Sequence, residues 1–175
     1  MANDLDKLLN FLEVERIDKY LFIGRSPKRP SRVFGGQVLA QALNAAIRTV
    51  EEDRLAHSMH AYFLRPGKPS KQIVYEVDPI RDGRSFTTRR VVAKQEGRAI
   101  FNTSVSFHTA EQGFNHQMDM PSVAPPEELQ SDHDFWSEMA VKHPGKFQAP
   151  TVEPIERLAV NRRDYLDPQP TEPEQ

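Results

Sequence analysis

The chain has 175 residues, 38% of them hydrophobic and 27% charged, with a formal net charge of −2; this suits one globular domain with a sizeable core and gives no general attraction to nucleic acid or an anionic membrane. The absence of cysteine excludes disulfides, a thiolate nucleophile and thiolate metal ligands, and suits a reducing cytoplasm. No apolar run approaches the ~20 residues of a membrane-spanning helix, and the first residues lack the basic-then-apolar pattern of a secretory signal.

The first half of the chain predicts two helices and a strand. Residues 3–14 carry leucines at helical spacing, and residues 20–24 are strand-like. Residues 37–50 predict a helix that is apolar around most of its circumference, and such a helix should be mostly buried. A narrow polar stripe follows the same helix at i, i+4, i+7 and i+11: Gln37, Gln41, Asn44 and Arg48.

Four strand-like runs follow the long helix. The first spans 55–65, where Leu55, His57, Met59, Ala61 and Phe63 alternate with the other positions and should face the helix. The second begins at 73 and ends at an Asp-Gly turn, where glycine supports a positive φ. The third spans 85–94, and a Glu-Gly turn leads into the fourth, around 99–107. This order predicts an α+β protein with an antiparallel sheet.

Beyond about residue 110 the periodic pattern ends. Three prolines lie within 121–128, residues 132–141 could form a short helix, and residues 150–175 are rich in proline and charge. We therefore predict a folded domain over 1–115 and a linker or tail over 116–175.

The glycine pair Gly35-Gly36 precedes the long helix, where free backbone N–H groups and the positive end of the helix dipole collect. Such a site can stabilise a carbonyl oxygen as it gains negative charge. We predict that Gly35, Gly36 and Gln37 bind substrate there. The alternative is a tight turn that needs glycine for its dihedral angles.

The histidines His57 and His60 are three residues apart on one strand, so they should point to opposite faces and cannot share a metal ion. His57 falls on the apolar, helix-facing side, where it could polarise a carbonyl or position water. A hydrogen-bonded core histidine is the alternative. His60 belongs to the other face, at the surface or an interface.

Several basic residues could meet a phosphate group, because arginine binds phosphate well; an ordinary solvated charged face is the alternative. These residues are Arg25, Lys28, Arg29, Arg32, Arg81, Arg84, Arg89 and Arg90. The sequence has no G-x-S-x-G, P-loop, G-x-G-x-x-G or H-E-x-x-H motif. Attack by an activated water is the chemistry that remains.

The sequence resembles the acyl-CoA thioesterase II family over residues 5–122 and more loosely over 150–173. The segments that carry the resemblance are VFGGQVLAQAL (33–43), HSMHAYFLRPG (57–67), IRDGRSF (80–86), RRV (89–91) and GFNHQ (113–117). The family implies a hot-dog fold, an antiparallel sheet wrapped around a central helix, here as one half of a double hot-dog. It implies hydrolysis of fatty acyl-CoA to fatty acid and coenzyme A, without a metal or an organic cofactor.

In that family an aspartate, a serine or threonine, and a glutamine of the second repeat orient the attacking water, and none of them can be carried onto this sequence. His57 matches the first histidine of the family's first repeat, so we predict it as the catalytic candidate. Three functions stay open: the N-terminal half of a thioesterase that needs its second half, a non-catalytic acyl-CoA-binding or packing module, and a self-sufficient hydrolase that pairs with itself. The expected partner is a second hot-dog repeat or a second copy in a homodimer, and the expected location is the cytoplasm.

Overall fold

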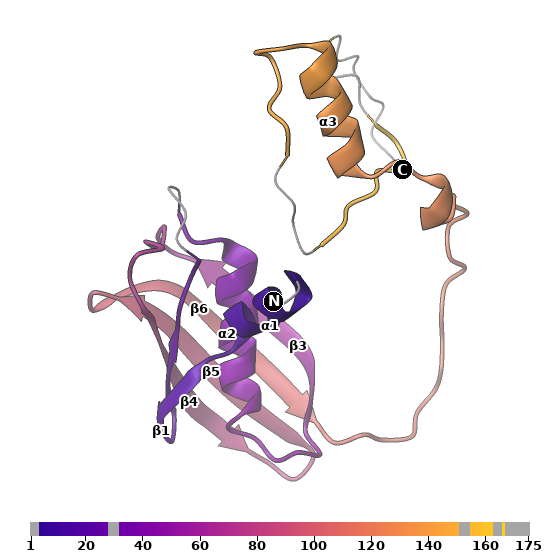
Figure 1. Ribbon diagram of the computed structural model, residues 1–175. Helices are drawn as coiled ribbons and strands as arrows, with labels where there is room; N and C mark the ends of the chain where they lie inside the picture. Colours follow the sequence, from indigo (N-terminus) through magenta and orange to yellow (C-terminus); the bar gives the residue numbers. More distant parts are fainter. Residues whose placement is uncertain (1–3, 28–31, 151–154, 163–165, 167–175) are drawn as a thin grey trace. The chain divides into compact units, whose positions relative to one another are not determined.

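The computed structural model describes residues 4–27, 32–150, 155–162 and 166, and the chain divides into two compact units, Met1–Phe114 and Asn115–Gln175. In the first unit a six-stranded antiparallel sheet wraps around one long helix, α2 (Figure 1). The elements of this unit are α1 (Asp4–Leu12), β1 (Glu15–Asp18), β2 (Leu21–Gly24), α2 (Gly35–Ile47), β3 (Leu55–Phe63), β4 (Ile73–Asp82), β5 (Phe86–Gln95) and β6 (Arg98–His108).

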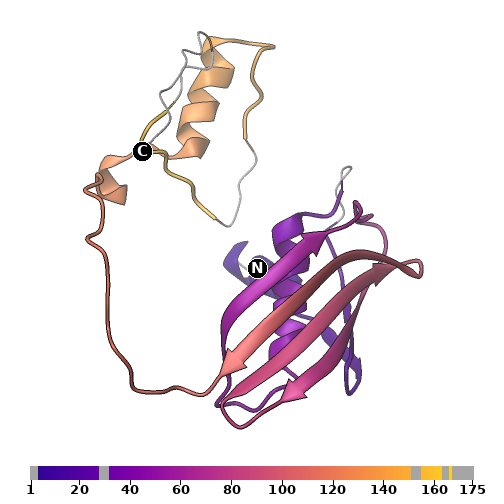
Figure 2. The same cartoon turned by 180° about the vertical axis from the view of Figure 1, so that it is seen from behind.

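The strand order is β1-β2-β4-β5-β6-β3, so the short β1 and the longer β3 form the two edges of the sheet. Figure 2 shows the sheet from behind, with α2 on its far side. The predicted α+β class with an antiparallel sheet is confirmed. Strand β1 was not predicted, because its four-residue segment, ERID, shows no alternation of apolar and polar residues.

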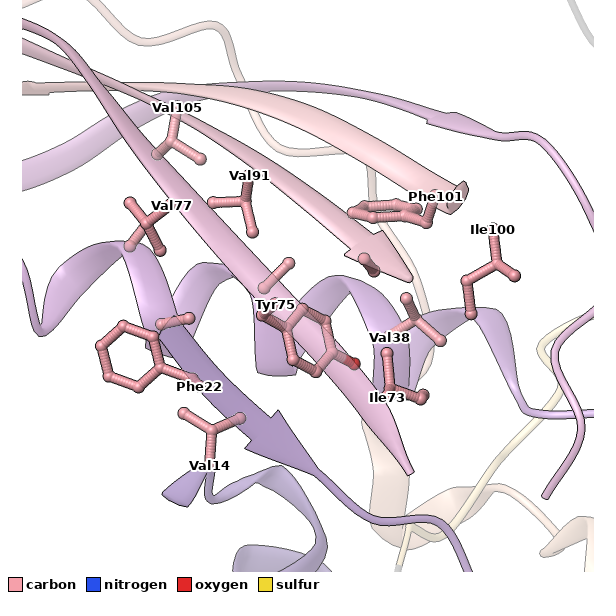
Figure 3. Close-up of a cluster of buried hydrophobic side chains, with 14 of the residues drawn as sticks. Val14, Phe22, Val38, Ile73, Tyr75, Val77, Val91, Ile100, Phe101 and Val105 are labelled. Atoms are coloured by element: carbon pink, nitrogen blue, oxygen red, sulfur yellow. The ribbon is translucent and has the colours of Figure 1, made fainter. Parts of the chain in front are cut away.

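The core lies between α2 and the inner face of the sheet (Figure 3). Three alanines of α2, Ala42, Ala45 and Ala46, are fully buried, so their small side chains let the strands approach the helix closely. Large side chains from the strands fill the remaining space, and the fully buried aromatic ones are Phe22, Tyr75, Phe101 and Phe107.

The polar stripe of α2 binds the main chain of the N-terminal segment. Gln41 donates to the carbonyl oxygens of Phe11 and Arg25, Asn44 donates to that of Leu12, and Arg48 donates to that of Val14. Gln41 also accepts a 2.7 Å hydrogen bond from the hydroxyl of Tyr75. The stripe is therefore an attachment surface for α1 and for the chain that leads into β1.

The two predicted turns use glycine for different reasons. Glu96 and Gly97 both have positive φ, as a tight hairpin turn requires. Gly83 does not, so the predicted reason for this glycine is wrong. A Cβ atom on Gly83 would lie 2.7 Å from the carbonyl oxygen of Phe86, to which the Gly83 N–H donates at 2.9 Å. Close approach of the two backbones excludes a side chain there.

The second unit contains a 3-10 turn, η1 (Pro126–Glu128), and the predicted short helix, α3 (Asp132–Lys142). The Ser131 hydroxyl caps α3 by accepting from the N–H of Asp134 at 3.0 Å. Arg162 donates to Asp132 at 2.8 Å and lies 4.4 Å from the ring centre of Phe135. These contacts join α3 to the chain near residue 162.

Candidate functional site

The start of α2 leaves backbone N–H groups available for a ligand. The N-cap residue, Phe34, has an extended backbone and makes no capping hydrogen bond through its side chain. The first N–H groups of an α-helix have no partner within the helix, and the helix dipole adds partial positive charge at the same end. Gly35 and Gly36 supply these groups, so the site favours an oxygen atom that carries negative charge.

A pocket of about 460 Å³ opens beside Gly35. Its apolar wall consists of Val33, Val38, Phe63, Ile100 and Phe101. Its polar part includes the cations Arg32 and Arg65. The volume lies within the range typical of small-molecule sites, roughly 300–1,000 Å³. This combination suits a ligand with an apolar chain and an anionic group.

Hydrogen bonds hold the loop after β3 against the sheet and so fix the pocket wall. The N–H groups of Leu64 and Arg65 donate to the carbonyl oxygen of Ile100 at 2.9 and 3.2 Å. The guanidinium of Arg65 donates to the carbonyl oxygen of Ala99 at 2.7 Å. The N–H of Val33 donates to the carbonyl oxygen of Gly67 at 2.9 Å, which ties the chain entering α2 to the same loop.

Phenylalanine rings cover both glycines at the helix start. A Cβ atom on Gly35 would lie 3.0 Å from the ring of Phe63, and one on Gly36 would lie 2.6 Å from the ring of Phe34. Neither glycine has a positive φ. A methyl group at either position would therefore require the neighbouring ring to move, and no dihedral angle that only glycine adopts is involved.

Only one of the three predicted substrate-binding residues, Gly35, lines the pocket. Gln37 is buried, and its amide donates to the carbonyl oxygen of Arg25 at 2.9 Å and to the hydroxyl of Ser26 at 3.0 Å. Gln37 therefore holds the end of β2 against α2. Substrate binding by Gly36 and Gln37 stays a prediction.

His57 lies on the outer face of the sheet, so the prediction that it faces α2 is wrong. Its Nε2 atom is 2.8 Å from the hydroxyl of Ser106, and its ring meets those of Phe86 and His108 at centroid distances of 5.7 and 4.7 Å. The physical reason is a register shift between Ala56 and Ser58, which inserts an extra residue into β3. That residue reverses the alternation, so Leu55 and His57 leave the face that Met59 shares with α2.

The structure does not bring His57 to the pocket. The pocket begins at Phe63, and six residues of extended strand, at ~3.3 Å each, separate it from His57 by roughly 20 Å. The catalytic role of His57 stays a prediction, without a contact to the carbonyl site at Gly35.

Two of the basic residues that were predicted to meet a phosphate bind other groups of the protein instead. Arg89 is buried, and it donates to Asp82 at 2.6 Å and to the carbonyl and hydroxyl oxygens of Thr49 at 3.0 Å. Arg90 donates to Asp78 at 2.7 Å. Among the described members of the set only Arg32 lines the pocket, and Lys28 and Arg29 lie outside the described residues.

Arg65 and Phe63 line the pocket although they were not predicted as site residues. Both precede the Pro66-Gly67 pair, and this break in the strand is the signal that could have identified a loop returning toward α2. Within the described parts of the chain, no three histidine, aspartate or glutamate side chains cluster as metal ligands would. The same described residues include no helix that is long and apolar enough to span a membrane.

Comparison with known proteins identifies the relatives of this chain. Residues 25–108 match the family described as "Acyl-CoA thioesterase N-terminal domain". Acyl-CoA thioesterase 2 of Haemophilus influenzae is 42% identical over 141 residues, which cover 80% of this chain and 49% of that protein. The solved TesB protein of Mycobacterium avium subsp. paratuberculosis is 37% identical with a TM-score of 0.67, covering 71% of this chain and 50% of that one.

A protein of hot-dog fold from Alicyclobacillus acidocaldarius superposes with a TM-score of 0.61 at 23% identity, over 75% of this chain and 49% of that one. At this identity the likeness concerns the fold, and the predicted hot-dog fold is confirmed. The chain spans about half the length of the relatives named here.

Proposed function

The chain belongs to the acyl-CoA thioesterase family through its N-terminal domain, and from this we propose that it is the N-terminal half of an enzyme that hydrolyses fatty acyl-CoA to a free fatty acid and coenzyme A. One observation carries the proposal: in the domain that matches the family, the uncapped start of α2 opens onto a pocket with an apolar wall and two arginines.

The start of α2 fits the carbonyl of a thioester. When water attacks the carbonyl carbon, the oxygen gains negative charge, and backbone N–H groups placed in advance stabilise that charge without reorganising. The Gly35 end of α2 supplies such groups together with the helix dipole. The developing oxyanion is therefore bound more tightly than the neutral carbonyl, which is the condition for acceleration.

The apolar and the cationic regions of the pocket match the apolar and the anionic parts of the substrate. Val33, Val38 and Phe101 would contact the alkyl chain, and each buried methylene contributes about 0.8 kcal/mol. Arg32 and Arg65 would face the phosphates of coenzyme A, for which guanidinium groups have matching geometry.

The group that activates the water is not among the pocket residues. No aspartate, glutamate or histidine occurs among the described residues that line the pocket. We propose that the water-orienting aspartate, serine or threonine, and glutamine come from a second repeat. The same observation favours the alternative function, in which the isolated domain binds acyl-CoA without hydrolysing it.

A second hot-dog repeat or a second copy of this chain would complete the assembly through β3. This strand is an edge of the sheet, and the exposed apolar residues Leu55, Tyr62, Phe63 and Leu64 lie on it or directly after it. Unpaired strand edges favour pairing with another chain. A cytoplasmic location and hydrolysis without metal or organic cofactor belong to the same proposal.

A thiol-release assay and a binding titration test the proposal on one preparation. We expect the purified chain to release coenzyme A from palmitoyl-CoA far more slowly than ~10 per second, the median for enzymes. We also expect saturable binding of an analogue in which a methylene replaces the thioester sulfur.

The two readouts separate the functions. Turnover near ~10 per second would show that the chain needs no second repeat. A chain that shows no turnover and binds no analogue would contradict the proposed thioesterase function altogether. Sedimentation of the same sample tests the assembly, because a lone 20.0 kDa species would contradict a homodimer.

A further inference from the structure

The ring of Phe63 lines the pocket beside Gly35, the first residue of α2, which lines the same pocket. Phe63 ends β3 and pairs with Phe101 of β6, and the centres of the two rings are 5.1 Å apart. The far edge of the ring meets Gly35, since a Cβ atom there would lie 3.0 Å from both Cε1 and Cζ of Phe63. Phe63 therefore lines the pocket directly beside the carbonyl site at Gly35.

Phe63 is held less firmly than the rest of the apolar wall. It is 60% exposed, whereas Phe101 is fully buried and Val38 and Ile100 are 4% and 5% exposed. The difference arises because β3 is an edge strand with a neighbour on one side only. The buried wall residues belong to the core, so a change in their size would disturb packing. Phe63 can change size or rotate without creating a core cavity.

We propose that Phe63 is a specificity-determining residue, whose ring sets how long an acyl chain the pocket accepts when the carbonyl lies at Gly35. This inference rests on the proposed function and names the side chain that selects among its substrates. The ring occupies space in the pocket beside Gly35. Removing the ring widens the pocket at the carbonyl site.

The expected effect follows from the length of chain that becomes buried. Each additional methylene removed from water strengthens binding about fourfold. Two or three further methylenes in the space left by the ring would raise the affinity for a long chain at least ~10-fold relative to a short one. A larger ring should act in the opposite direction.

The experiment compares binding of two non-hydrolysable analogues, with acyl chains of eight and sixteen carbons, to the full chain by calorimetry. We expect Phe63→Ala to raise the ratio of sixteen- to eight-carbon affinity at least ~10-fold, and Phe63→Trp to lower it. The matched control is Tyr62→Ala, because Tyr62 is the adjacent aromatic residue, is 58% exposed, and faces the other side of the sheet. Its ratio should stay within about twofold of wild type.

Three outcomes separate this inference from the proposed function. A ratio unchanged by both Phe63 variants, in proteins that melt like wild type and bind the analogues, overturns the role of Phe63 and leaves the function standing. A Tyr62→Ala shift as large as that of Phe63→Ala also overturns it, because aromatic removal anywhere on β3 would then suffice. Failure of both analogues to bind the wild-type chain overturns the function and this inference together.

Discussion

Replacing Tyr75 with phenylalanine tests the buried hydrogen bonds that attach the N-terminal segment. The hydroxyl of Tyr75 donates to Oε1 of Gln41 at 2.7 Å, and both side chains are fully buried. The Gln41 amide nitrogen is occupied by the carbonyl oxygens of Phe11 and Arg25. Tyr75→Phe therefore leaves Oε1 buried without its donor.

A buried acceptor without a partner costs about 1–3 kcal/mol, the desolvation penalty that the hydrogen bond had offset. For a unit of this size the loss corresponds to a decrease in melting temperature of roughly 4–12 °C. Thermal and urea denaturation of the chain measure both quantities. Tyr62→Phe is the control, because this exposed tyrosine should change stability by less than about 0.5 kcal/mol.

The same substitution has a signature at high pH. Burial raises the pKa of Tyr75 far above its ordinary value of 10.0, so the folded protein keeps a proton that the unfolded chain loses. Stability from this group is fully present below pH 10.0 and falls as the pH rises beyond it. In Tyr75→Phe, the loss of stability with rising pH should be smaller than in the wild type by up to about 1.4 kcal/mol per pH unit. The reasoning would be refuted if the variant and the wild type had the same free energy of unfolding at pH 7 and the same decrease in that free energy above pH 10.0.

Two further substitutions test the packing and the corrected position of the histidine. Gly24→Ala should destabilise the chain by about 1–3 kcal/mol through overpacking, because the new methyl group would lie 2.4 Å from Oε1 of Gln41. Gly113→Ala, with nothing within 4 Å of its Cβ position, is the control, and equal urea midpoints for the two variants would be contrary to this account. His57→Ala should change the free energy of unfolding by less than about 1 kcal/mol, since the ring is exposed and its hydrogen-bond partner is the hydroxyl of Ser106. A larger loss in thermal melts would contradict this exposed position, whereas a loss of turnover in the assembled enzyme would support the catalytic role of His57.

The fold was largely predictable because its strongest signals are local. The apolar circumference of α2, the alternation in β5 and β6, and the Glu96-Gly97 turn each report the environment of their own residues. Resemblance to a known family supplied the name of the fold. Strand β1 was missed because four exposed residues carry no pattern of burial.

The candidate site was less predictable because it depends on contacts between distant segments. The position of His57 depends on one inserted residue in β3, and alternation cannot reveal such an insertion. Arg65 and Phe63 join the pocket because Ile100 and Ala99 hold the loop after β3, some 35 residues away in sequence. The role of Arg89 follows from its contact with Thr49 at the end of α2, which composition cannot indicate.

The attachment of the N-terminal segment through main-chain carbonyls has a consequence for sequence divergence. Gln41, Asn44 and Arg48 bind oxygen atoms that every residue possesses, so the exposed positions 11 and 13 can change their side chains with little effect on docking, whereas Val14 is buried in the core. Docking on the helix therefore depends on the spacing of the main-chain carbonyl groups along the segment. Related chains could therefore differ at the exposed positions of this segment while tolerating no insertion or deletion in it, a pattern that an alignment of the family would display as a gapless block whose variation is confined to those positions.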